Sequence, residues 1–114
     1  MRVRYLEIVT KDVDGTIAVV EATGLKFSEP DTMLGNARVA DMSDGGQVAV
    51  RAPMHDAEDA VTRTYFSSTN IEKDTQAAIT AGAELAHPIM EIPGKCHFSI
   101  FFHGENQFGF WQDQ

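Results

Sequence analysis

An internal repeat constrains the fold of this chain more than any other feature of its sequence. The segment TIAVVEATG, residues 16–24, resembles TQAAITAG, residues 75–82, and each runs into a glycine-led stretch with a proline six positions on, GLKFSEP and GAELAHP. Further matches in the same order, at offsets of 58 to 60 residues, pair Tyr5 with Tyr65, Gly35 with Gly94, Asp44-Gly45 with His103-Gly104, and Gln47 with Gln107. Ordered matches at a nearly constant offset indicate two copies of one supersecondary unit.

Each copy is predicted to form a strand, a helix and three more strands. In the first copy, alternation over residues 5–9 predicts a strand, and the spacing of Ile17 and Val20 predicts a helix over residues 14–22. A short strand over residues 25–30 ends at a proline, and strands over 35–42 and 47–51 meet at the turn SDGG. The second copy predicts a strand over 65–69, a helix over 74–81, a strand over 84–86 and a closing hairpin around HGENQ. The predicted fold class is α+β, a single domain of two tandem βαβββ modules over residues 1–53 and 61–114, with a polar linker over 54–60.

Composition narrows the class of protein. A length of 114 residues suits one domain, and a formal net charge of −8 disfavours binding to a phosphate backbone. No apolar run approaches the length of a membrane span, and the start MRVRYLEIVTKD turns charged too early for a signal peptide. The single cysteine, Cys96, excludes an internal disulfide and is expected in the core. These features predict a cytoplasmic protein with no nucleic-acid partner and no membrane association.

Three stretches resemble the vicinal-oxygen-chelate superfamily, which includes glyoxalase I, bleomycin-resistance proteins and extradiol dioxygenases. EIVTKDVDGTIAVVEATGLKFSEP is similar to the first strand and helix of that family, and ITAGAELAHPIMEIPGKCHFSIFF to its second helix and the strands that follow. The ending FGFWQ resembles the glyoxalase-like, predicted-hydroxylase branch. The resemblance implies a curved mixed sheet around a cavity, and a homodimer, but no single reaction, because the fold hosts many chemistries.

The resemblance also implies where a divalent metal would bind. Metal-binding members carry His or Glu on the first and last strands of each unit, and these positions fall here on Tyr5, on Tyr65 or Thr64, on Ala49 and on Gly109. Alanine, glycine and threonine are not ordinary metal ligands, and tyrosine is an uncommon one. The sequence therefore predicts no metal and no cofactor. His97 is a weaker alternative as a metal ligand, since no second His or carboxylate stands at an obvious spacing from it.

Period-2 alternation predicts which side chains face the cavity. Apolar residues such as Leu6, Val48 and Phe110 are expected beneath the helices, together with Val39 and Phe98 on the third strands. The opposite face then carries a candidate catalytic residue, Glu7, and a set of candidate ligand-binding residues: Tyr5, Arg38, Gln47, Arg51, Tyr65, Ser67, His97, Gln107 and Trp111, with Ser99 beside them. The expected site is a polar and aromatic pocket with the small residues Ala49 and Gly109 at its floor.

Each leading candidate has a second interpretation. Glu7 is either a general acid or base or the salt-bridge partner of an arginine. Trp111 either stacks on a planar ligand or closes the end of the barrel, and Arg38 and Arg51 either hold an anionic group or stay solvated at the rim.

Three classes of function follow. The first and favoured one is a metal-independent small-molecule-binding protein of the glyoxalase/bleomycin-resistance type. The second is a divalent-metal-dependent glyoxalase-like lyase, isomerase or dioxygenase, and the third is a structural or regulatory partner. Whether the protein is an enzyme stays open at this point.

Overall fold

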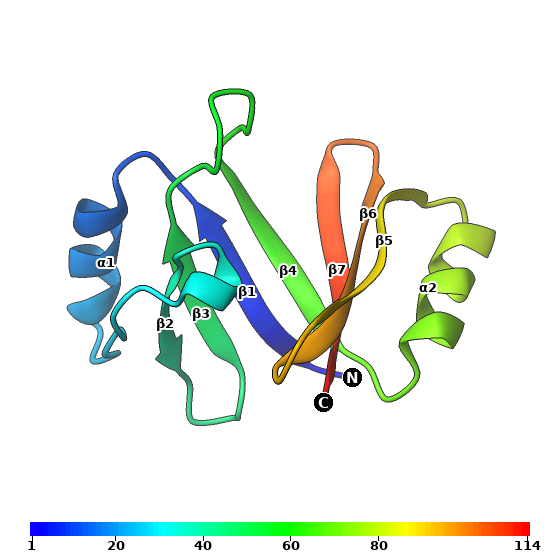
Figure 1. Cartoon of the computed structure of the whole chain (residues 1–114), viewed down its shortest axis with the longest axis horizontal. Coiled ribbons are helices and arrows are strands. Elements are labelled where there is room, and N and C mark those ends of the chain that lie inside the picture. The colour runs from blue at the N-terminus through cyan, green and yellow to red at the C-terminus, as the bar shows by residue number, and fades with distance from the viewer. The chain divides into compact units, whose positions relative to one another are not determined.

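The computed structural model describes all 114 residues and contains two α-helices, a short 3₁₀ helix at Thr32–Leu34 and seven strands (Figure 1). The helices are α1 (Val13–Glu21) and α2 (Ile71–Thr80). The strands are β1 (Val3–Val9), β2 (Arg38–Asp41), β3 (Gln47–Arg51), β4 (Val61–Ser67), β5 (Glu84–Ile92), β6 (Cys96–His103) and β7 (Asn106–Asp113). The α+β class is confirmed. The chain divides into two compact units, Tyr5–Thr62 and Arg63–Gln114, the second of which includes residues Met1–Arg4.

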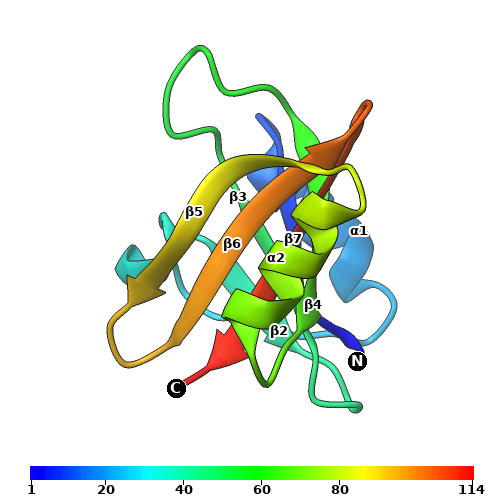
Figure 2. The same ribbon diagram turned by 90° about the vertical axis from the view of Figure 1, so that its right-hand side faces the viewer.

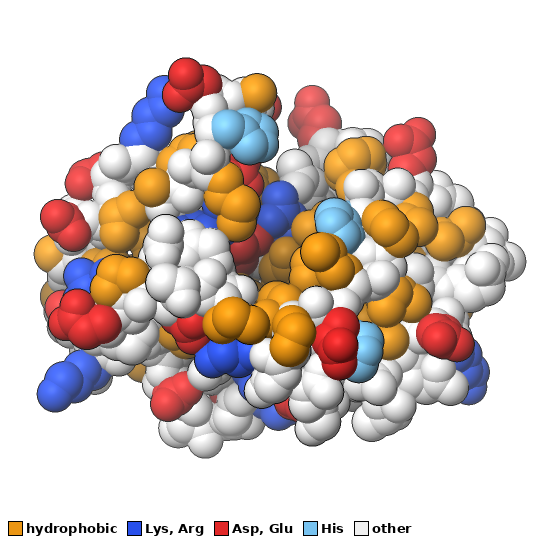
Figure 3. Space-filling model, viewed as in Figure 1, with side chains coloured by type: hydrophobic (Ala, Val, Ile, Leu, Met, Phe, Trp, Pro, Cys, Tyr) orange, Lys and Arg blue, Asp and Glu red, His pale blue; other side chains and the backbone are white.

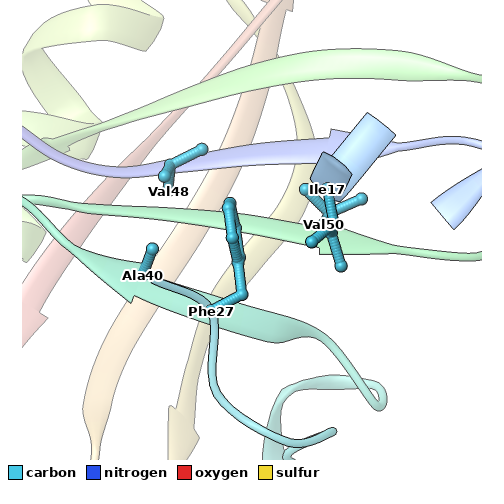
Figure 4. Close-up of a cluster of buried hydrophobic side chains, with 5 residues drawn as sticks. All are labelled: Ile17, Phe27, Ala40, Val48 and Val50. Atoms are coloured by element: carbon cyan, nitrogen blue, oxygen red, sulfur yellow. The ribbon is translucent and has the colours of Figure 1, made fainter. Parts of the chain in front are cut away.

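The unit Tyr5–Thr62 packs one helix on a small mixed sheet. Its strand order is β2-β3-β1, with β1 parallel to β3 and β2 antiparallel to it. The helix α1 begins at Asp12, whose carboxylate accepts a hydrogen bond from the backbone N–H of Gly15 at 3.0 Å and so caps the first turn. Figure 4 shows the core that α1 and the loop after it form with the sheet, made of Ile17, Phe27, Ala40, Val48 and Val50.

The strand predicted over residues 25–30 does not form, so that prediction was wrong. The backbone N–H of Ser28 donates to the carbonyl of Val39 at 2.8 Å, but the N–H of Val39 donates back to the side-chain Oγ of Ser28 at 3.0 Å. The Ser28 side chain thus replaces the backbone carbonyl as the acceptor for Val39, which removes one backbone hydrogen bond that strand pairing needs. Pro30 has no N–H and cannot donate another. The pairing is reduced to an isolated bridge between Asp31 and Ala37.

The unit Arg63–Gln114 has the complete βαβββ order. Its strands are arranged β4-β7-β6-β5, with β4 parallel to β7 and the other pairs antiparallel. The helix α2 covers one face of these strands (Figure 2), and Ile71, Phe101 and Phe110 form the core beneath it. Asn70 caps α2 by accepting from the N–H of Lys73 at 3.2 Å.

The strand β5 is longer than the three residues predicted for it. It spans Glu84–Ile92 and runs through Pro88, with register shifts on both sides of His87. Proline is tolerated there because β5 is an edge strand. On an edge strand every second backbone N–H points away from the sheet, so a residue without an N–H at such a position costs no hydrogen bond between strands. Hydrophobic side chains gather over β5 on the surface of this unit (Figure 3), and Leu85, Ile89 and Met90 are the exposed ones. Neither helix has the length and apolar character needed to cross a membrane.

Candidate functional site

In the unit Tyr5–Thr62, β1 and β3 turn alternate side chains to opposite faces of the sheet. Leu6, Val48 and Val50 pack against the core beneath α1, which leaves Tyr5, Glu7, Gln47, Ala49 and Arg51 on the face away from the helix. Glu7 lies next to Ala49 across the parallel pair. Gln47 donates its amide to Asp41 at 2.8 Å.

Glu7 and Arg51 form a buried ion pair. The Nε of Arg51 donates to Glu7 Oε2 at 2.8 Å, and the Arg51 side chain is only 4% exposed. Glu58 closes the cluster: its two carboxylate oxygens accept from Nη1 and Nη2 of Arg51 at 2.8 and 2.7 Å. The hydrogen bonds that Arg51 donates to Glu58 and Glu7 raise the pKa of its guanidinium above the ordinary value, although burial alone would lower it. Arg51 is therefore a permanent cation whose fork is filled by carboxylates.

The Arg51 cluster also ties down the segment after β3. Glu58 Oε1 accepts from the backbone N–H of Met54 at 2.7 Å, and Arg51 Nη1 donates to the carbonyl of Ala52 at 3.2 Å. Glu58 lies in the stretch that the sequence marks as a polar linker. Sequence reasoning missed it because three acidic residues stand close together there, and no periodicity tells which of them turns inward.

A pocket of about 540 Å³ opens beside this cluster, within the same unit. Its wall combines the first turn of α1, the loop before β2 and the segment after β3: Val13, Asp14, Pro30, Gly35, Asn36, Arg38, Arg51, Ala52, Pro53 and Met54. The loop and the segment approach closely at Gly35, which has a φ of +67° and where a side chain would collide with the Met54 methyl group. Glycine meets both demands.

Arg38 lines this pocket and not the sheet face away from α1, so its predicted orientation was wrong. It is the cross-strand partner of Val50, and directly opposed residues of an antiparallel pair share a face. Since Val50 is part of the core beneath α1, Arg38 lies on the helix side, while Val39 pairs with Ala49 on the other side.

In the unit Arg63–Gln114, Gly109 makes room for an aromatic ring. Gly109 lies next to Tyr65 in the parallel pair of β4 and β7. A Cβ at position 109 would lie 2.6 Å from the carbonyl oxygen of Ser99, and closer still to the ring of Tyr65. Real Cβ atoms do not approach so closely, so this position accepts no side chain while Tyr65 keeps its place.

Trp111 lies on the same face of β7 as Gly109 and is held on several sides. The ring of Tyr65 meets it edge-on, at 5.8 Å between centroids, and the guanidinium of Arg4 lies 5.6 Å from its centroid. Its Nε1 donates to Asp113 Oδ1 at 3.1 Å. Arg4 also binds Asp113 with two hydrogen bonds, of 3.0 and 2.9 Å, and holds the pKa of that carboxyl below its usual range.

The remaining candidates of this unit divide between the two faces of its sheet. Gln107 accepts from Arg63 at 2.7 Å, and Ser67 Oγ accepts from the backbone N–H of Arg2 at 3.0 Å, both on the Trp111 face. His97 and Ser99 instead lie on the α2 face, so their predicted orientation was wrong. Ser99 Oγ is 2.9 Å from Thr75 Oγ1 of α2, and His97 pairs across the strands with Gln112, whose side chain accepts from the N–H of Ile71.

Phe98, and not its neighbours His97 and Ser99, lies on the Trp111 face of the sheet. It pairs with Trp111 and meets Tyr65 edge-on at 6.3 Å between ring centroids. The Nε2 of His97 lies 3.7 Å from Glu91 Oε2, and the two belong to no group of three or more His, Cys, Asp and Glu side chains that could hold a metal ion. The register with the antiparallel partner β7 fixes which β6 side chains lie on each face of the sheet, and the sequence of β7 alternates clearly. Assigning the faces of β6 from β7 across the turn gives the correct orientation of His97 and Ser99.

Comparison with known proteins finds relatives by structure. No family model matches the chain, and no curated protein matches it in sequence. A methylmalonyl-CoA epimerase variant from Streptomyces coelicolor, solved with 2-nitronate-propionyl-CoA, superposes with a TM-score of 0.69 at 16% identity, covering 99% of this chain and 97% of that one. A methylmalonyl-CoA epimerase from Mycobacterium tuberculosis gives 0.75 at 11% identity, covering 99% and 88%, and a hypothetical protein from Bacillus halodurans gives 0.71 at 10%, covering 99% and 94%. The chain has the fold of the vicinal-oxygen-chelate superfamily.

The vicinal-oxygen-chelate fold implies a metal, and the residues of this chain do not fit one. Of the four expected ligand positions, Ala49 and Gly109 carry no donor atom, and the space above Gly109 is filled by the ring of Tyr65. No group of three or more His, Cys, Asp and Glu side chains gathers at a spacing that could hold an ion. A stable site for a transition metal needs three or four converging donors.

Proposed function

We propose that the protein is a metal-independent small-molecule-binding protein of the vicinal-oxygen-chelate fold. The observation that carries the proposal is the pair Tyr65–Gly109, where an aromatic ring occupies the space that a carboxylate ligand would need. The Glu7–Arg51–Glu58 cluster supports it, because Glu7, which pairs across the strands with the expected metal position Ala49, is already engaged with a cation.

The pocket of the unit Tyr5–Thr62 is the proposed ligand site. Its volume of about 540 Å³ lies in the range of pockets that hold small organic molecules, and its wall mixes apolar side chains with a few polar ones. Several structural relatives carry coenzyme A esters in their crystals, which shows that proteins of this fold accommodate organic ligands.

A metal analysis tests the proposal. The protein is expressed in medium supplemented with Zn, Ni, Mn and Fe, dialysed, and assayed for metal, and its thermal unfolding is compared with and without EDTA. We expect well below one ion per chain and no shift in the unfolding temperature. Near one ion per chain, with lyase, isomerase or dioxygenase activity that EDTA abolishes, would establish the metal-dependent alternative instead.

The homodimer stays a prediction. The exposed apolar side chains of the edge strand β5 are consistent with a further contact surface. Sedimentation at tens of micromolar protein decides between a dimer and a monomer.

A further inference from the structure

We infer that the pocket of the unit Tyr5–Thr62 binds a small monocarboxylic acid with an apolar body, and that Arg38 holds its carboxylate. The inference rests on the proposed function and names the class of ligand. It depends on a difference between the two arginines that line the pocket: the guanidinium of Arg51 is bound by carboxylates, and that of Arg38 is not.

Arg51 cannot supply the anion site. Its Nε is engaged by Glu7, and Glu58 takes both of its terminal nitrogens in a bidentate pair. An incoming carboxylate would have to displace either the buried Glu7 or the partly buried Glu58 from Arg51, which leaves a charge without its partner and is unfavourable.

Arg38 is oriented by the protein and keeps its binding groups free. Its Nε donates to the carbonyl of Ser28 at 2.8 Å, and this bond fixes the plane of the guanidinium. The two terminal amino groups have no hydrogen-bond partner within the chain and belong to a side chain that lines the pocket. A guanidinium fork held in this way matches the two oxygens of a carboxylate.

The rest of the wall selects the body of the ligand and its charge. Val13, Pro30, Pro53 and Met54 supply apolar surface for an alkyl or aryl group. Asp14, whose carboxylate makes no ion pair or hydrogen bond within the chain, lines the same pocket. Its negative charge opposes a second charge on the ligand, so a monocarboxylate is favoured over a phosphate monoester or a dicarboxylate.

Glu58 is a positioning residue for this site. It binds Arg51 on β3 and the N–H of Met54, and so holds the segment that forms one side of the pocket. We therefore expect the loss of the Glu58 carboxylate to weaken ligand binding without a change in the preference for acids over amides.

The test uses phenylacetate, phenylacetamide and phenyl phosphate as probes, titrated against the 15N-labelled protein by NMR. We expect phenylacetate to bind with shifts confined to residues of the pocket, and phenylacetamide and phenyl phosphate to bind at least tenfold more weakly. Arg38→Gln should weaken phenylacetate at least tenfold, since hydrogen bonds between charged groups are roughly twice as strong as neutral ones. Lys26→Gln removes an exposed charge of the same unit and serves as the matched control.

The outcomes separate the inference from the proposed function. Equal binding of phenylacetate and phenylacetamide in the pocket overturns the inference and leaves a metal-independent binding protein. Phenylacetate binding that is unchanged in Arg38→Gln, with the fold verified by the NMR spectrum, also overturns it. No binding of any probe at 10 mM, on the order of the weakest affinity that such a titration detects, overturns it as well. The metal analysis is independent of all three results.

Discussion

The two units share a first strand, a helix and a closing pair of strands, but the matching positions on these strands hold different chemistry. Arg51 and Trp111 occupy matching places on the last strand of each unit, two residues after Ala49 and Gly109. In the first unit the position holds a buried cation between two carboxylates, whereas in the second it holds an indole between aromatic rings and a guanidinium. A duplicated backbone therefore constrains which face a residue occupies and leaves the character of that face free to diverge.

The buried ion cluster is the most sensitive point of the first unit. Arg51→Met keeps an unbranched side chain but removes the guanidinium and its charge, which leaves Glu7 and Glu58 without their common partner. We expect a loss of about 3–5 kcal/mol in the free energy of unfolding, the usual cost of breaking a buried pair on one side. Urea denaturation followed by circular dichroism measures it.

The triple variant in which Met replaces Arg51 and Gln replaces both glutamates is the control for this change. It removes the unpaired charges as well, so it should recover part of the lost stability. If Arg51→Met alone costs less than 1 kcal/mol, water reaches the cluster in the folded protein and the cluster is not a buried one.

The second unit should be most sensitive at its glycine. Gly109→Ala places a Cβ against the Tyr65 ring and the Ser99 carbonyl, and overpacking of this kind costs about 1–3 kcal/mol. The matched change at the repeat position, Ala49→Gly, removes a methyl group and adds no collision. Adding Tyr65→Ala should relieve the ring contact only, since the carbonyl is part of the backbone of β6.

The labelling rate of the Cys96 thiol measures how far Gly109→Ala loosens the structure around β6. Burial, followed by the negative charge of Asp113, raises the pKa of this thiol to about 12, so the folded protein should react very slowly with iodoacetamide at pH 8. We expect Gly109→Ala to increase the labelling rate by opening the unit, and Ala49→Gly to leave it near the wild-type value. Equal rates in all three proteins would show that the collision is absorbed without loosening β6.

The repeat in the sequence predicted the element order well, because apolar periodicity and glycine stops are local signals. The exceptions have local causes too: the hydroxyl of Ser28 replaces a backbone acceptor, and Pro88 lies on an edge strand where it does not end the pairing. The resemblance to the vicinal-oxygen-chelate fold is confirmed by the structural relatives.

The candidate site was less predictable, because it depends on contacts between distant segments. The strands β1, β3 and β7 alternate clearly, and their faces followed from the pattern. The predicted orientations of Arg38, His97 and Ser99 did not take the partner strands into account. The observed strand pairing places all three residues on the helix side. The partner Glu58 has no periodic signal, since it is held by contacts with Arg51 and with the backbone N–H of Met54.

The smallest expected difference lies at the edge of the second unit, in the pair of Arg4 and Asp113. Arg4 holds the pKa of Asp113 below the ordinary value of 3.8, mainly through their hydrogen bonds. A carboxyl whose pKa is lower in the folded protein stabilises the fold above its unfolded pKa, and this contribution is lost as the pH falls through the folded value. Because the Asp113 side chain is 53% exposed, the contribution should stay below about 1 kcal/mol at pH 7.

Asp113→Asn isolates this contribution, since it keeps Arg4 beside Trp111 and keeps an oxygen that accepts from the indole N–H. We expect the variant to be slightly less stable than the wild type at pH 7, and the two urea midpoints to converge as the pH falls below 3.8 and through the lowered pKa of Asp113, with Glu105→Gln, an exposed loop residue, as control. A difference that persists unchanged at pH 2 would assign the effect to the indole contact. A difference of several kcal/mol at pH 7 would mean that the second unit depends on a buried ion pair just as the first one does.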